Sequence, residues 1–332
     1  MVDPAVGVMF RCQSPPEKLP GYAQRAERAG FDELWVVEDC FFTGGVASAA
    51  VALANTDRIE VGLGIVPAVA RNVAFTAMEV ATLARLYPGR ILPGIGHGVA
   101  DWMRQVGAAP ESQLNALEEV VASVRALLRN ETVSTSGDYA NLDGVILNHP
   151  PEQVPPVYTG VRGPRSLALS GRVADGTILA ECAPPAYVLW ARDRLKEGAE
   201  AVGHTDQHRL TVYALCKVDR DSDAARRALR PAVAEVLASG SASAHLAPMG
   251  IEDEVAGMVE SGGVDLLIRE MPDEWLDQLA IVGSPDECAA AIGALAESGA
   301  DSVVLIPSID QPEEDLDAFK RELLPVLGKS QV

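Results

Sequence analysis

The sequence has 332 residues, of which 48 % are hydrophobic and only 5 % aromatic, and its formal net charge is −20. This acidic balance argues against a nucleic-acid-binding protein, because phosphate contacts need a basic surface, and against binding to anionic membranes. The five cysteines are scattered, odd in number and form no C-x-x-C motif, which argues against a disulfide framework and a zinc site. An anionic small ligand is still compatible with local arginines and helix N-termini.

The N-terminal segment MVDPAVGVMF has neither a basic start nor a long apolar run, so we expect no signal peptide. No stretch approaches about 18 consecutive apolar residues, the length typical of a membrane-spanning helix. We therefore expect a cytoplasmic protein whose partner is a small molecule, with no nucleic acid, membrane or metal involved.

The first quarter of the chain alternates short apolar strands with helices. Val6–Phe10 is predicted as a strand, and the amphipathic helix after it ends at Gly30. Glu33–Val37 is predicted as a second strand, and Val46–Asn55 as a helix of small residues. This order is typical of a parallel sheet with helical crossovers.

The segment Asp57–Gly98 is predicted as strand, helix and strand. Glu60–Ile65 alternates β-branched residues with glycines, which indicates a bulge or a close backbone approach. The helix that follows has one apolar face and ends at Tyr87–Arg90, because proline cannot continue a helix and glycine supplies a turn. Ile91–Gly96 is then a second buried strand, and its end forms part of the sequence GIGHG.

The middle of the chain contains one long excursion. Residues 131–156 are rich in Ser, Thr, Gly, Asn and Pro, and we predict a small hairpin on one face of the fold. Regular alternation flanks this excursion on both sides. The predicted elements are a helix over Leu114–Leu128, strands at Val157–Gly160, Gly176–Leu179 and Leu210–Val218, and helices at Pro164–Val173 and Ala186–Val202.

The C-terminal part predicts an insertion followed by the last barrel unit. Residues 221–280 are expected to form a mostly helical insertion. A capping box at Ser284–Glu287 starts a helix, Ser302–Ile306 is an eighth strand, and a closing helix runs from about Glu313 to Leu327. Eight strands alternating with helices predict a (β/α)8 barrel, with residues 1–332 as a single domain. An open doubly wound sheet is the alternative, weakened because the first strand–helix turn lacks G-x-G-x-x-G.

Five segments, taken in order, resemble the bacterial-luciferase-like superfamily. Within it, the chain is most similar to the branch that uses the deazaflavin coenzyme F420, and the similarity runs from Val6 to about Pro307. The resemblance implies a barrel with the flavin-like ring over the C-terminal ends of the strands. The segments are GLGIVPAVARN, ATLARLYPGRILPGIGHG, WMRQVGA, PVYTGVRGPRSLALSGRVADGTIL and IVGSPDE.

The resemblance implies two parts of a cofactor site. A non-prolyl cis peptide at Gly64–Ile65, in a bulge of the third strand, would lie behind the concave face of the ring; an ordinary glycine bulge is the alternative. The second part matches the family segment that holds the cofactor phosphate, where a helix starting after a glycine turn offers free N–H groups, although a turn with solvated arginines is also compatible. This second part comprises Gly160, Val161, Arg162, Gly163, Pro164, Arg165 and Ser166, with the two arginines adding positive charge.

The second strand ends in Glu38-Asp39-Cys40, where related proteins often have Ser-Asp-His. Asp39 matches this pattern, and the resemblance implies that it contacts the ring system and acts in catalysis. Cys40 replaces the histidine expected near the hydride-transfer position, so imidazole chemistry there is in doubt. We keep Cys40 as a candidate catalytic residue, although the role of a small apolar packing residue suits it better than that of a nucleophile.

His97, in GIGHG, is the best-placed imidazole for a proton donor at neutral pH, with a structural hydrogen bond as the alternative. Val99 stands where some deazaflavin dehydrogenases have a glutamate, which argues against their exact sugar-phosphate chemistry. Glu38, Trp102 and Glu181 are candidate residues of the substrate pocket; a solvated turn or a packing aromatic would explain them equally well. The other four histidines have no motif around them.

We therefore predict an F420-dependent oxidoreductase that transfers a hydride between ring carbon C5 and a small organic substrate. Residues 131–156 and 221–280 are expected to roof an apolar substrate pocket. The alternatives are an FMN-dependent luciferase-like monooxygenase and a non-catalytic cofactor-binding barrel. A homodimer is implied by the resemblance alone, and the substrate and the direction of hydride transfer stay open.

Overall fold

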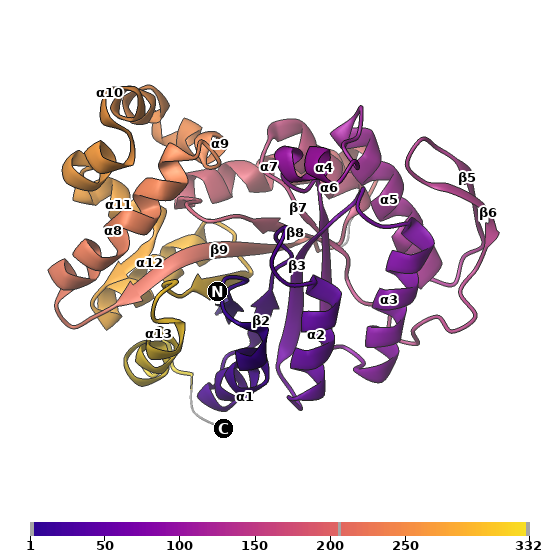
Figure 1. Ribbon diagram of the computed structural model, residues 1–332, viewed down its shortest axis with the longest axis horizontal. Helices are drawn as coiled ribbons and strands as arrows, with labels where there is room; N and C mark the ends of the chain where they lie inside the picture. Colours follow the sequence, from indigo (N-terminus) through magenta and orange to yellow (C-terminus); the bar gives the residue numbers. More distant parts are fainter. Residues whose placement is uncertain (1–2, 205–206, 330–332) are drawn as a thin grey trace.

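Eight parallel strands form a closed barrel in the computed structural model, which describes residues 3–204 and 207–329. β8 pairs with both β7 and β9, which closes the ring (Figure 1). The predicted (β/α)8 barrel is therefore confirmed, and the open sheet is wrong. The strands are, in barrel order, β9 (Arg209–Val218), β11 (Ser302–Ile306), β1 (Ala5–Phe10), β2 (Glu33–Val36), β3 (Glu60–Pro67), β4 (Ile91–Gly96), β7 (Tyr158–Gly160) and β8 (Gly176–Leu179).

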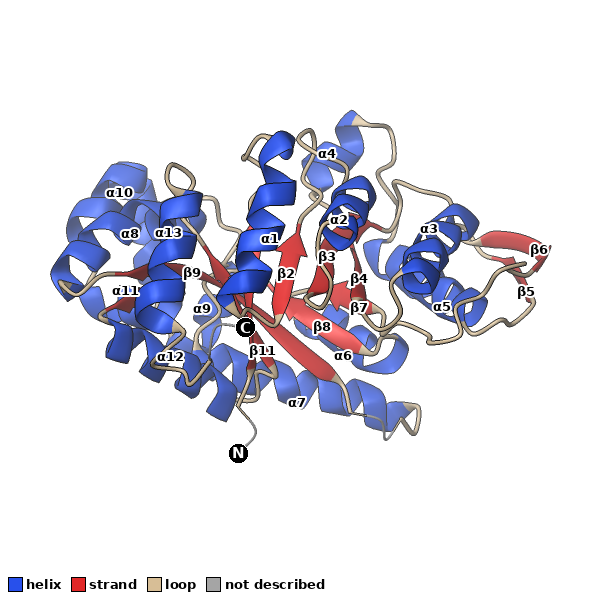
Figure 2. Cartoon of the chain, turned by 90° about the horizontal axis from the view of Figure 1, so that it is seen from below, coloured by secondary structure: helices blue, strands red, loops and turns tan. Residues whose placement is uncertain are grey.

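Helices surround the barrel (Figure 2). They bury one apolar face each: in α3, Ala77, Val80, Ala81 and Ala84 are at most 3 % exposed. The predicted capping box of α12 is present, with Ser284 and Glu287 bonded reciprocally. The helices between the strands are α1 (Leu19–Ala29), α2 (Gly45–Ala54), α3 (Val73–Leu86), α4 (Ala100–Gln105), α5 (Gln113–Leu128), α6 (Pro164–Val173), α7 (Pro185–Ala201), α12 (Pro285–Glu297) and α13 (Pro312–Ala318), the last continued by a π-helical turn at Phe319–Leu323.

Two excursions leave the barrel in opposite directions (Figure 1). The predicted hairpin consists of β5 (Val133–Ser136) and β6 (Asn141–Val145), and Glu119 of α5 holds it by accepting the backbone N–H groups of Tyr139 and Ala140. The insertion is mostly helical, as predicted, and packs on the C-terminal half of β9. It contains α8 (Ser222–Ala238), α9 (Ser243–Leu246), α10 (Glu252–Glu270) and α11 (Asp273–Leu279), followed by an unpredicted strand, β10 (Ile281–Gly283), that pairs with β9.

The interior of the barrel is filled by large side chains and forms a solid floor for the mouth. Trp35 contacts Tyr158 and Tyr213 edge to face, with ring centroids 5.9 and 5.5 Å apart. Below them, the fully buried carboxylate of Glu33 accepts hydrogen bonds from Trp35 and Ser302, both at 2.7 Å, and pairs with Arg209. The charge of Glu33 is thus compensated inside the barrel by Arg209.

No helix within residues 3–204 and 207–329 is long and apolar enough to cross a membrane. The same residues contain no group of three or more His, Cys, Asp or Glu side chains that could hold a metal ion.

Candidate active site

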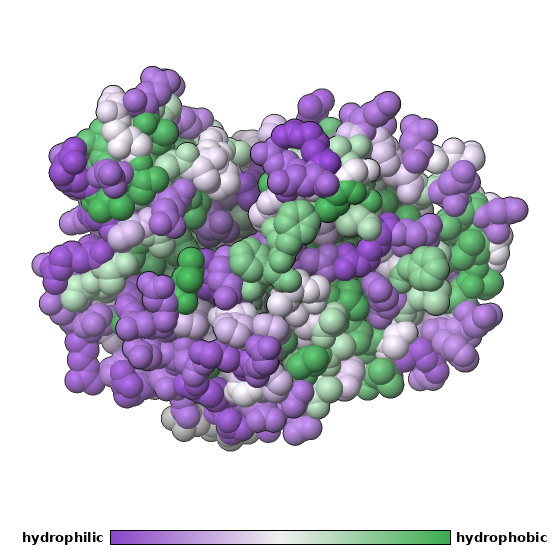
Figure 3. Space-filling view, in the orientation of Figure 1, coloured by the Kyte–Doolittle hydropathy of each residue, from purple (hydrophilic) through white to green (hydrophobic). Residues whose placement is uncertain are grey.

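A cavity of about 400 Å³ lies at the C-terminal ends of the barrel strands. Its wall comes from the ends of β1, β2, β3, β7, β8, β9 and β11, from Trp102 of α4 and from the second half of α8 with the turn after it. Figure 3 shows the surface hollowed between the insertion and the rest of the barrel mouth. Among the residues that the sequence suggests, the lining contains Asp39, Gly64, Ile65, Trp102, Gly160, Val161, Arg162 and Glu181.

A ridge in β3 rises from the floor of this cavity. The register between β3 and β4 shifts between Leu63 and Val66, and the Gly64–Ile65 peptide is cis, as the resemblance implied. A Cβ atom on Gly64 would lie 1.9 Å from the hydroxyl of Tyr213, so only glycine fits there. The Cys40–Phe41 peptide is also cis, which the sequence did not suggest.

Glycines of the neighbouring strands make room for the ridge. Cβ atoms on Gly94, Gly96 and Gly160 would come within 3.1, 2.9 and 2.8 Å of the Ile65 side chain, respectively. The glycines at the end of β4 therefore serve the packing of Ile65 against the strands beside it.

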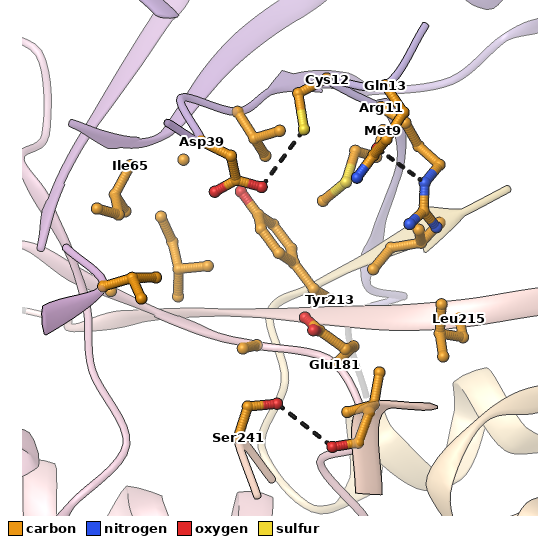
Figure 4. Close-up of a pocket in the computed structure, with 18 of the residues that line it drawn as sticks. Met9, Arg11, Cys12, Gln13, Asp39, Ile65, Glu181, Tyr213, Leu215 and Ser241 are labelled. Carbon is orange, nitrogen blue, oxygen red and sulfur yellow. Dashed lines mark hydrogen bonds between the residues drawn. The ribbon is translucent and has the colours of Figure 1, made fainter. Parts of the chain in front are cut away.

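Asp39 lies between Ile65 and the far wall of the cavity (Figure 4). The thiol of Cys12 donates to its carboxylate at 3.4 Å, and burial raises the pKa of Asp39. Burial, with the adjacent Asp39, also raises the pKa of Cys12 to about 12. The hydroxyl of Tyr213 is buried without a hydrogen-bond partner among the described residues and points toward Asp39 in the figure.

The N-terminus of α6 faces open space next to the cavity. Gly163 is its N-cap, no side chain caps the helix, and no atom lies within 4 Å of the position that a Cβ on Gly163 would occupy. Pro164 and Arg165 are exposed. The free N–H groups of the first turn are thus available to an anion.

His97 is turned toward α6 and is absent from the cavity lining. Its Nε2 lies 3.1 Å from Oγ of Ser166, and its Nδ1 is buried without a partner among the described residues. Burial lowers the pKa of His97, which favours the neutral ring. This geometry supports the structural alternative over a proton donor to a ligand in the cavity.

Arg162 is bound to the insertion. Its guanidinium donates to the carbonyl oxygen of Ser241, and its own carbonyl accepts from Tyr187 at 2.5 Å. The expected contribution of its charge to phosphate binding stays a prediction, because this bond to a neutral carbonyl leaves the guanidinium charged. Arg162 also fixes the turn after α8 to the barrel mouth.

Three expectations about the cavity differ from the structure. Glu38 does not line the cavity, because its carboxylate binds Arg71 at 2.6 Å and accepts the N–H of Gly45 at 2.7 Å. Cys40 is also absent from the lining, and burial with the neighbouring carboxylates raises the pKa of its thiol, which does not suit a nucleophile. Residues 131–156 do not line the cavity, although we expected them in its roof. Of residues 221–280, those that line it belong to α8 and the turn after it.

The model of the family described as luciferase-like monooxygenase matches residues 4–302. The chain belongs to this family. A 5,10-methylenetetrahydromethanopterin reductase of Methanolobus tindarius is 30 % identical over 90 % of the chain and 92 % of the relative. An F420-dependent glucose-6-phosphate dehydrogenase of Kineococcus radiotolerans is 31 % identical over 95 % of the chain and 94 % of the relative.

Solved structures of two F420-dependent enzymes share the fold of this luciferase-like chain. The coenzyme F420-dependent tetrahydromethanopterin reductase from Methanopyrus kandleri superposes with a TM-score of 0.84 at 22 % identity, covering 98 % of this chain and 100 % of the other. An F420-dependent secondary alcohol dehydrogenase, solved with an F420–acetone adduct, gives 0.76 at 22 % identity, with 98 % and 99 % covered.

Sequence reasoning missed six polar residues of the cavity in this luciferase-like barrel, among them Gln13 and Ser241. Arg11, Cys12 and Glu235 carry no motif, and Tyr213 reads as an ordinary strand residue. Position offers the one usable signal: Arg11 and Cys12 directly follow β1, where barrel enzymes place site residues.

Proposed function

We propose that the protein is an F420-dependent oxidoreductase that transfers a hydride between C5 of the deazaflavin ring and a small organic substrate. The observation that carries this proposal is the combination of the Gly64–Ile65 ridge in the cavity and the open N-terminus of α6 next to it. The curated relatives with F420 in their names, which match along nearly the whole chain, support the same cofactor.

The described residues fit such a cofactor. The ring of the cofactor would rest on the ridge and face the cavity. The phosphate of the cofactor would accept hydrogen bonds from N–H groups in the first turn of α6, with Arg165 and Ser166 beside them. Gly163 leaves this approach free of side-chain atoms. When bound, F420 supplies the hydride chemistry, while the protein supplies binding and orientation.

The side chains of the mouth would orient the substrate and exchange a proton. We assign the proton to Asp39, because it lines the cavity, its pKa is raised, and the Cys12 thiol holds one of its oxygens. We expected His97 to donate this proton. We now assign it the positioning of Ser166, because its Nε2 contacts the Oγ of Ser166 at the start of α6.

Parallel titrations of the purified protein with F420, FMN and NADPH test the cofactor. We expect saturable binding of F420, seen as a change in its absorbance and fluorescence, and no binding of FMN at the same concentration. Preferential binding of FMN would contradict the proposal and favour a monooxygenase. Binding of F420 without hydride exchange, in the presence of a panel of alcohols, aldehydes and enones, would favour a non-catalytic barrel.

A further inference from the structure

The cavity has two chemically different ends. Figure 4 shows Ile65 at one side and Arg11 with Leu215 at the other, with Asp39 and Tyr213 between them. The end beside Ile65 belongs to the ridge. The opposite end, here called the distal end, has Arg11, Gln13 and Leu215 in Figure 4, and the charges of Glu181 and Glu235 act on Arg11 there.

The distal end has an uncompensated negative charge. Arg11 donates to the carbonyl oxygen of Pro307 at 3.1 Å and to the side-chain oxygen of Gln13 at 3.4 Å. Within residues 3–204 and 207–329, neither Glu181 nor Glu235 has a cation within 4.0 Å or a donor to its carboxylate, so both are left to water or to a ligand.

Electrostatics across the whole cavity point the same way. Burial lowers the pKa of Arg11, while Glu181 and, more weakly, Glu235 raise it, so both carboxylates act on the same space. The described lining contains three carboxylates, the third being Asp39, against the two guanidinium groups of Arg11 and Arg162. The lining therefore has an excess of one formal negative charge, and neither Glu181 nor Glu235 forms a salt bridge with either arginine among the described residues.

The distal end also has an apolar wall. Leu215 and Ile306 are buried strand residues, whereas Ile309 is 49 % exposed although it lines the cavity. A bound molecule with a short apolar part would cover this surface. The two carboxylates beside it accept hydrogen bonds and offer none.

We infer that the distal end binds the substrate and that this substrate is a neutral or cationic alcohol, or the matching carbonyl compound, with hydroxyl or amino groups for Glu181 and Glu235. A phosphorylated or carboxylated substrate is disfavoured, because it would add negative charge beside carboxylates that lack partners. In the oxidising direction, the carbinol carbon loses a hydride to F420 and its hydroxyl loses a proton to Asp39, which leaves a carbonyl group.

This inference rests on the proposed function, but its test has a separate readout. We would measure binding of 1-amino-2-propanol, 2-butanol and lactate by calorimetry, with the protein alone and with F420 present. These secondary alcohols are similar in size and carry a positive, zero and negative charge. The expected order of affinity is cation, then neutral, then anion, with lactate at least about tenfold weaker than the cation.

Charge-removing variants assign the effect to residues. Glu181→Gln and Glu235→Gln should each reduce the ratio of cation to anion affinity severalfold, whereas Glu131→Gln, at an exposed position outside the cavity, should leave it unchanged. Lactate binding as tightly as 1-amino-2-propanol would overturn the inference, as would a ratio that neither glutamate variant alters or a failure of both the cation and 2-butanol to bind. Loss of F420 binding would instead count against the proposed function.

Discussion

Replacing Gly64 by alanine tests the support beneath the ridge. The added Cβ would lie 1.9 Å from the Tyr213 hydroxyl, 3.1 Å from its Cζ and 3.2 Å from Cε3 of Trp35. Ordinary contact begins near 3.4 Å, so the hydroxyl or the ridge must move by about 1.5 Å. Tyr213 cannot swing away freely, because its ring packs edge to face against the fully buried Trp35.

The magnitude follows from this overpacking. Inserting one methyl group into a filled core costs about 1–3 kcal/mol, and the rigid neighbours favour the upper half of that range. Urea denaturation should therefore show a free energy of unfolding about 2–3 kcal/mol lower for Gly64→Ala. If the ridge also carries the ring, the affinity for F420 should fall in the same variant.

A second substitution separates the contact from a general effect of alanine. Tyr213→Phe removes a hydroxyl that has no partner among the described residues, so alone it should cost little. In the double variant Gly64→Ala/Tyr213→Phe, the free energy of unfolding should recover by about 1–2 kcal/mol relative to Gly64→Ala alone, a coupling expected of residues in contact. Gly21→Ala, on the exposed side of α1 with no atom within 4 Å, should stabilise the protein slightly. Equal stability of Gly64→Ala and the wild type would refute the reasoning.

Three further predictions follow from the site and the buried histidines. Gly163→Asp should cap α6 and keep or raise stability, yet abolish F420 binding, because the carboxylate would occupy the N–H groups and add negative charge there. Gly163→Ala should retain most of the F420 binding. Equal binding by both variants, measured by titration, would contradict the phosphate assignment. Asp39→Asn should lower kcat by about 10²–10³ and remove the acid limb of the pH profile, since a base with a raised pKa loses activity as the pH falls through that pKa; an unchanged profile would exclude Asp39. Burial lowers the pKa of His208 and His245 to about 4, so the unfolded chain binds more protons between that pH and 6.5. The free energy of unfolding should then fall by on the order of 1–2 kcal/mol per histidine between about pH 7 and pH 5; His208→Gln should flatten this slope, exposed His149→Gln should not, and a slope equal in all three proteins would argue against burial as the cause.

The barrel was predictable because its signals are local and repeated. Each strand is a short apolar run bounded by turn residues, and each helix has a 3.6-residue apolar period. The boundaries of Gly176–Leu179, Pro164–Val173 and Ser302–Ile306 therefore agree with the structure. β10 escaped prediction because its three residues, Ile281–Gly283, give no periodicity to measure.

The cavity was less predictable, because its composition depends on which strand ends face inward together. Arg11 and Glu181 are 170 positions apart in the chain, and nothing local in either segment reports that both act on the same space. Conversely, Glu38 occupies a position typical of a site residue but is used by Arg71 and the start of α2. The residue type indicates what a side chain can do, while its partners decide what remains available.

The same dependence on surrounding contacts decides which residue exchanges a proton with the substrate. A group that exchanges a proton with a bound substrate must touch the cavity and change its protonation state near neutral pH. His97 fails the first condition, since it contacts Ser166 and does not line the cavity. Cys12 and Tyr213 fail the second, since burial raises the pKa of Cys12 to about 12 and that of Tyr213 well above its usual value. Asp39 lines the cavity beside the ridge, and burial raises the pKa of its carboxyl group, which is the direction that suits a group exchanging a proton with a substrate.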